Sequence, residues 1–126
     1  MNKNIGKGSF YFIAEIGVNH EGDLIQALEM VEQVARSGAN AAKFQAYKAE
    51  KLVVSSAKAY WDTAFEKETS QLALFKKYDS FGAKEYQKIQ EKCIECGVDF
   101  LATPFDLEAV QMLDTLMDSF KIASAD

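Results

Sequence analysis

The 126-residue sequence is poor in the residues that mark zinc-binding, disulfide-rich and proline-rich proteins: it has one histidine, two cysteines and one proline. Cys93 and Cys96 form a C-x-x-C pair, but a structural zinc ion needs about four ligands, and His20 is the only histidine. A redox pair usually opens a helix, whereas this pair closes one just before Gly97. We therefore interpret the cysteines as one buried thiol and one thiol near a helix end.

Long apolar runs and positive charge are also scarce. The first ten residues do not resemble a signal peptide, and the short apolar run that follows contains Glu15, so it is not a membrane span. The chain has 14 basic and 19 acidic residues, a net charge of −5. This balance argues against general binding to nucleic acid or to an anionic membrane, but not against a small anion held by a few lysines. With 48% apolar residues, we expect one cytoplasmic domain over residues 1–126.

Short apolar segments alternate with helical patterns along the chain. We expect strands over 11–16, 40–46, 98–102 and 119–123. We expect helices over 23–37, 70–78 and 83–96, and one from 106 onward that buries Leu107, Val110, Leu113 and Leu116. The alternation predicts an α/β fold with a parallel sheet, whose ligands gather at the carboxyl ends of the strands. The stretch 47–70 is interpreted equally as a functional lid and as a surface excursion.

Three of the predicted strands carry one charged residue each: Glu15, Lys43 and Lys121. A charge inside a packed strand is costly unless it is paired or bound, so three of them suggest a shared polar site. Lys43 and Gln45 share one face of their strand, and lysines suit a phosphate or carboxylate ligand. For any one residue the alternative is a buried ion pair, such as Glu15 with Lys43.

Two further polar residues follow strands. His20 lies in a turn rich in glycine and asparagine, where it acts either as a base or ligand or, as we favour, as a hydrogen-bonded turn histidine. Thr103 either offers its hydroxyl and N–H to an anion or only caps the next helix.

Four short motifs, in order and at suitable distances, resemble those of the sialic acid synthase family. They are AEIGVNHEG over 14–22, AKFQ over 42–45, FLATPF over 100–105 and FKIAS over 120–124. The resemblance implies a (β/α)₈ TIM barrel, of which this chain supplies the N-terminal half with about four strands. It also implies condensation of phosphoenolpyruvate with an N-acetylmannosamine-type sugar, which gives a nonulosonic (sialic-type) acid and phosphate.

The resemblance also implies residue roles. The substrate-binding residues are expected to be Lys43, Gln45, Thr103, Lys121 and Ser124, with the two lysines, Thr103 and Ser124 on phosphoenolpyruvate and Gln45 facing the sugar. The catalytic residues are expected to be Glu15 and Asp126. The family uses a divalent metal, Mn or Mg, whose ligands we expect outside this chain.

A full barrel needs roughly 250 residues, so the isolated chain is expected to be inactive. Open strand edges favour pairing with another copy, which predicts a homo-oligomer. Two alternatives remain: a phosphoenolpyruvate-dependent synthase that uses another aldose, and a non-catalytic binding or assembly module.

Overall fold

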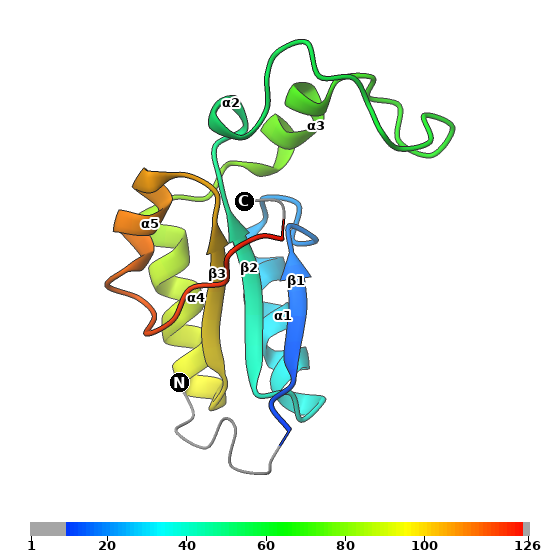
Figure 1. Cartoon of the computed structure of the whole chain (residues 1–126). Coiled ribbons are helices and arrows are strands. Elements are labelled where there is room, and N and C mark those ends of the chain that lie inside the picture. The colour runs from blue at the N-terminus through cyan, green and yellow to red at the C-terminus, as the bar shows by residue number, and fades with distance from the viewer. Residues whose placement is uncertain (1–9, 125–126) are drawn as a thin grey trace.

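A computed structural model describes residues 10–124, and it contains a three-stranded parallel sheet (Figure 1). The strands are β1 (Ile13–Gly17), β2 (Ala41–Ala46) and β3 (Asp99–Pro104), in the order β1-β2-β3. The helices are α1 (Leu24–Arg36), α2 (Ala49–Leu52), α3 (Gln71–Tyr78), α4 (Ala83–Cys96) and α5 (Leu107–Leu113). The predicted parallel α/β class is confirmed.

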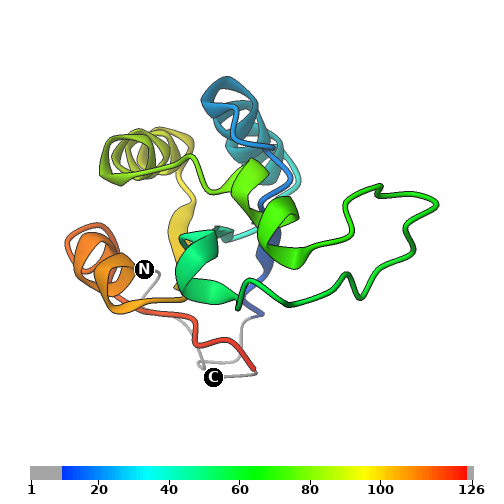
Figure 2. The same cartoon turned by 90° about the horizontal axis from the view of Figure 1, so that it is seen from above.

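The long helices cover one face of the sheet. Helices α1 and α4 lie side by side behind the strands, and α5 follows beside β3, as the view from above shows (Figure 2). The β1–α1–β2 crossover is short, whereas the connection from β2 to β3 contains α2, α3 and α4. This arrangement leaves the carboxyl ends of all three strands at one edge.

Local sequence signals set the helix ends. The Asp23 carboxylate accepts hydrogen bonds from the Ile25 and Gln26 N–H groups, and the Asp106 carboxylate accepts one from the Ala109 N–H. Helix α4 ends at Gly97, whose φ of 72° lies in the left-handed region that favours glycine. The end positions expected from the sequence at these residues are confirmed.

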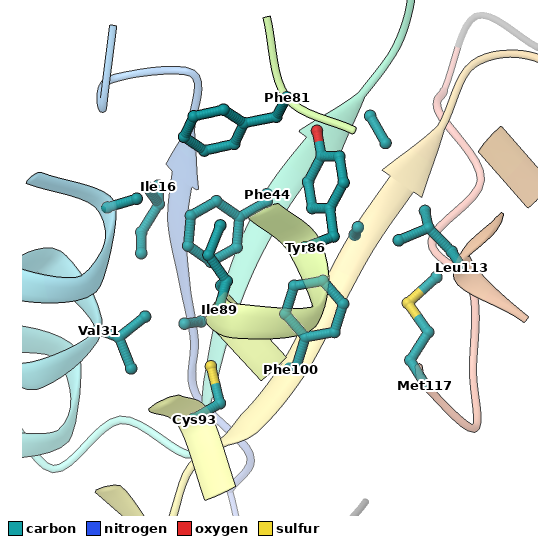
Figure 3. Packing of buried hydrophobic residues seen from close by; sticks show 14 of the residues in the cluster. Ile16, Val31, Phe44, Phe81, Tyr86, Ile89, Cys93, Phe100, Leu113 and Met117 are labelled. Atoms are coloured by element: carbon teal, nitrogen blue, oxygen red, sulfur yellow. The ribbon is translucent and has the colours of Figure 1, made fainter. Parts of the chain in front are cut away.

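The core lies between the sheet and the helices (Figure 3). Phe44 and Phe100 project from β2 and β3 toward Val31 on α1 and Ile89 on α4. Cys93 belongs to the same cluster, and burial raises the pKa of its thiol to about 12. Both cysteines are free and only Cys96 is partly exposed, as expected for structural thiols.

The predicted buried face of α5 is partly wrong. Leu107 is 80% exposed, whereas the residues that pack inward are Ala109, Leu113 and, beyond the helix end, Met117. These three residues recur every four positions and share one side of the helix, and Leu107 in the first turn projects from the other side.

The fourth strand is not formed, so the prediction of about four strands is wrong for the described residues. Residues 119–124 have no regular secondary structure; they cross the sheet face opposite α1 and α4 (Figures 1 and 2). An extended segment becomes a strand only when its backbone pairs along a sheet edge. Here Phe120 packs against the core, while Lys121 and Ile122 remain exposed.

The stretch between α2 and α3 forms a surface excursion that projects away from the sheet (Figures 1 and 2). An isolated bridge between Lys58 and Ser70 and a hydrogen bond from Trp61 Nε1 to the Glu68 carbonyl at 3.0 Å hold it together. Tyr60 and Phe65 on it are exposed. Across residues 10–124, no helix combines the length and apolar character needed to cross a membrane.

Candidate functional site

Four of the predicted site residues lie together on one face of the sheet, two in the middle of their strands and two close to the carboxyl ends. Glu15 is the register partner of Lys43, and Gln45 is the partner of Thr103. Ala42 and Phe44, which alternate with Lys43 and Gln45 along β2, belong to the buried core, so Lys43 and Gln45 take the opposite face, as predicted.

Lys43 is the centre of this cluster. Its amine forms an ion pair with Glu15 Oε2 and contacts Thr103 Oγ1 at 3.5 Å. The Lys43 side chain is only 12% exposed, whereas the Glu15 side chain is 50% exposed. The sheet therefore holds a mostly covered cation whose negative partner faces solvent. The ion pair considered from the sequence does form, and its acidic member is the accessible one.

An irregularity at the end of β1 shapes the space beside Glu15. The register shifts between Glu15 and Gly17, which is typical of a β-bulge, and Gly17 has a φ of 60°. A Cβ atom at Gly17 would lie 3.4 Å from Glu15 Oε1 and 3.6 Å from Gln45 Nε2. The absence of a side chain at Gly17 thus leaves these two polar groups as neighbours.

His20 lies apart from the polar cluster, among aromatic rings. Its ring stacks on Phe81 with centroids 4.2 Å apart and planes 8° apart, and its Nδ1 accepts the Gly22 N–H at 3.1 Å. Burial lowers the pKa of the imidazole. Among residues 10–124, Nε2 has no hydrogen-bond partner. The interpretation of His20 as a hydrogen-bonded turn histidine is confirmed.

The remaining predicted residues are not held with Lys43. Lys121 is exposed in the irregular segment, where its amine contacts the Ile122 carbonyl, and Ser124 is exposed in a turn. Asp126 lies outside the described residues. The cause is the missing fourth strand, which was expected to place Lys121 beside β3.

Residues 10–124 contain no set of ligands for the expected divalent metal. Within residues 10–124, no three His, Cys, Asp or Glu side chains are arranged to hold a metal ion. His20 uses one ring nitrogen on Gly22 and lies between Phe81 and Phe44. No chemical step at this site is therefore assigned to a metal.

One contact at the site was not predicted. The Tyr86 hydroxyl, on α4, donates to the Gln45 carbonyl at 2.8 Å. The helical pattern marks Tyr86 as a core residue, and nothing in the pattern identifies its hydroxyl as a partner of β2.

The fold and this cluster define a class of protein: a parallel α/β unit with a polar cluster on one face of its sheet that reaches the carboxyl ends of the strands, where parallel α/β proteins bind their ligands. The model of the NeuB family matches residues 30–126. The chain belongs to the NeuB family.

Several relatives are named for their reactions. The chain is 38% identical, over 90% of its length, to an N,N'-diacetyllegionaminic acid synthase of Campylobacter jejuni, of which it covers 35%. It is 32% identical, over 96% of its length, to the N-acetylneuraminate-9-phosphate synthase of Homo sapiens, of which it covers 34%. The chain thus spans about a third of the length of these curated relatives.

A solved structure agrees with the fold. All of this chain superposes on 41% of the N-acetylneuraminic acid (sialic acid) synthetase of Leptospira borgpetersenii serovar Hardjo-bovis, solved in complex with citrate, with a TM-score of 0.79 and 35% identity. The β/α arrangement therefore corresponds to one part of a larger synthase structure.

Proposed function

We propose that this chain supplies a phosphoenolpyruvate-binding part of a synthase that condenses phosphoenolpyruvate with an N-acetylmannosamine-type sugar. The products are a nonulosonic acid and phosphate. The observation that carries the proposal is the mostly covered amine of Lys43 beside the half-exposed carboxylate of Glu15, in contact with Thr103 near the carboxyl end of β3. Support also comes from relatives named as legionaminic acid and N-acetylneuraminate-9-phosphate synthases.

Lys43 suits a ligand that carries a carboxylate and a phosphate. Its present partner, the Glu15 carboxylate, is half-exposed and can turn into solvent when a ligand takes its place. An incoming ligand with more negative charge than Glu15 can therefore take over the amine at small cost. The Thr103 hydroxyl, 3.5 Å from the same amine, is placed to donate a second hydrogen bond to that ligand.

The reaction assigns a separate task to Glu15. The methylene carbon of phosphoenolpyruvate forms a bond to the aldehyde carbon of the sugar, and the aldehyde oxygen takes up a proton. Water then adds to the electron-poor enol carbon and loses a proton, which leaves a hydroxyl and the phosphate on the same carbon. This hydroxyl gives up its proton as it becomes the keto carbonyl, and the carbon–oxygen bond to phosphate breaks to release phosphate. A carboxylate released from Lys43 is a suitable base for that water, and Gln45 faces the sugar.

Lys121 and Ser124 are proposed as further phosphoenolpyruvate ligands, and Asp126 as a second catalytic group. The segment after α5 crosses the sheet and runs toward the carboxyl ends of the strands (Figure 1). We also propose that turnover needs parts of a synthase beyond this chain, including the ligands of a Mn or Mg ion. The outer edges of β1 and β3, which pair with no further strand in the described part of the chain, favour self-association.

Calorimetric titration with phosphoenolpyruvate tests the binding site. Lys43→Ala is expected to weaken binding roughly 10- to 100-fold, the effect of losing a charge-assisted hydrogen bond. Lys92→Ala is the matched control, because Lys92 forms an ion pair with Glu32 on the helical side of the molecule. Circular dichroism verifies that both variants are folded. No binding by the unmodified chain, or equal affinities for all three proteins, would overturn the proposal.

A further inference from the structure

Within residues 10–124, the Gln45 carbonyl near the end of β2 has no N–H partner in the β1–β2 ladder. The Ala41 N–H donates to Phe12 on the β1 side, whereas the Ala46 carbonyl accepts the Phe105 N–H on the β3 side. Because hydrogen-bonding directions alternate along a strand, the Gln45 carbonyl faces the β1 side. The register shift at the bulge places Gly17, the last paired residue of β1, opposite Phe44. The Gln45 carbonyl is thus beyond the reach of the β1–β2 ladder.

Tyr86 supplies the missing donor. Its hydroxyl lies 2.8 Å from the Gln45 carbonyl oxygen, and the residue is 4% exposed. The ring packs against Phe81 and Phe100, with centroids 6.0 and 6.5 Å away, so its direction is fixed by the core. Figure 3 shows the hydroxyl pointing toward the carboxyl end of β2. Burial raises the pKa of this hydroxyl, which therefore stays protonated and able to donate.

We infer that Tyr86 is a positioning residue, whose hydroxyl replaces the ladder bond lost at the β1 bulge and so orients Gln45 for ligand binding. Gln45 Nε2 and Glu15 Oε1 both lie beside Gly17, so a rotation of the Gln45 backbone changes the position of its amide relative to the Glu15–Lys43 pair. A core residue far from any ligand thereby acts on the site through one hydrogen bond. The part of this inference that concerns ligand affinity rests on the proposed function; the part that concerns Gln45 does not.

Removal of the hydroxyl alone separates this role from packing. Tyr86→Phe keeps the ring in the core, and Tyr47→Phe is the matched control. Tyr47 is also buried, but its hydroxyl lies 3.4 Å from the carbonyl of Phe75 on α3, away from Gln45. Both variants lose one buried hydroxyl, so a general effect on the fold should appear in both.

Nuclear magnetic resonance of the full chain provides the first readout. In Tyr86→Phe, the carbonyl carbon and side-chain amide signals of Gln45 should shift. The carbonyl carbon signals of Ala27 and Val31, on the buried side of α1, should not. Tyr47→Phe should leave Gln45 unchanged. In the unmodified chain, the Tyr86 hydroxyl proton should exchange slowly with water. Unmoved Gln45 signals, or a rapidly exchanging hydroxyl proton, would overturn the inference, and the second observation needs no variant.

Phosphoenolpyruvate affinity provides the second readout. Tyr86→Phe should weaken binding roughly fivefold, the effect expected from one neutral hydrogen bond, and Tyr47→Phe should not. If Gln45 shifts but the affinity is unchanged, the hydroxyl does not act on the site and the inference fails. If the unmodified chain binds no phosphoenolpyruvate, the proposed function fails, while the Gln45 signals still decide whether Tyr86 orients this residue.

Discussion

The two faces of the sheet are built from the same strands but have opposite character. Toward α1 and α4, Phe44 and Phe100 are buried among aliphatic side chains (Figure 3). On the other face, Lys43, the residue before Phe44 in β2, forms an ion pair with Glu15 and contacts Thr103. Because side chains alternate along a strand, each strand contributes to both surfaces. The comparison shows how a small sheet separates what stabilises the fold from what can bind a ligand.

The polar face contributes little to stability. Replacement of a covered ion pair by apolar side chains is often neutral or stabilising, so a pair such as Glu15–Lys43 is poor evidence for a stabilising role. The apolar face has the opposite property, since every buried methylene there adds to the free energy of unfolding. Substitutions on the two faces should therefore change different measured quantities.

The largest effect is expected on the apolar face. Ile89→Ala removes a fully buried side chain from α4 and should lower the free energy of unfolding by about 2–5 kcal/mol, through lost burial and the cavity left behind. Ile94→Ala is the matched control: it lies in the same helix, is 66% exposed, and should change stability by less than about 0.5 kcal/mol. Urea unfolding followed by circular dichroism measures both. Similar losses in the two variants would contradict the division between the faces.

The division could be predicted from the sequence because it depends on local periodicity. Alternation in β2 separates Lys43 and Gln45 from Ala42 and Phe44, and the structure agrees. The helical period likewise indicates the buried side of α4, with Tyr86, Ile89 and Cys93. Both patterns arise within one element, so no knowledge of its neighbours is needed.

Features that depend on contacts between different helices and strands could not be predicted from local periodicity. The segment 119–123 has the composition of a strand, but it does not pair with β3, and Lys121 is therefore not on the sheet. The bond from Tyr86 to Gln45 joins residues 41 positions apart and arises only because the β1 pairing, shifted at the bulge, ends opposite Phe44. A sequence pattern contains neither the bulge nor the packing that directs the Tyr86 hydroxyl.

The free energy of unfolding is expected to depend on pH because His20, a titratable residue, is buried among aromatic rings. Burial lowers the pKa of His20, so in the folded state the imidazole stays neutral at pH values where the unfolded chain binds a proton. Stability is therefore fully present above the unfolded pKa of about 6.5 and falls as the pH drops below it, by at most about 1.4 kcal/mol per pH unit. Urea unfolding between about pH 7.5 and about pH 5 measures this slope, because the carboxylates titrate mainly below that range.

His20→Phe provides the control for this slope. Phenylalanine can stack on Phe81 in the same way but cannot titrate, and the chain contains no other histidine. The variant loses the bond from the Gly22 N–H, so its stability is lower at neutral pH, but its profile down to about pH 5 should be flat. An unchanged slope in the variant would show that another group is responsible.

The smallest effect is expected at the amino end of the polar face. The Tyr11 hydroxyl donates to Asp99 Oδ2 at 2.5 Å. Asp99 is the first residue of β3 and the register partner of Ala41, the first residue of β2. Tyr11→Phe should lower the free energy of unfolding by about 1 kcal/mol, the net effect of one hydrogen bond, while Tyr60→Phe, at a residue 77% exposed, should leave it unchanged. Phosphoenolpyruvate affinity should be the same in both variants, because Lys43 and Thr103 lie further along the strands, toward their carboxyl ends. A loss of affinity in Tyr11→Phe would mean that the polar face acts as one unit, and that its amino end is not purely structural.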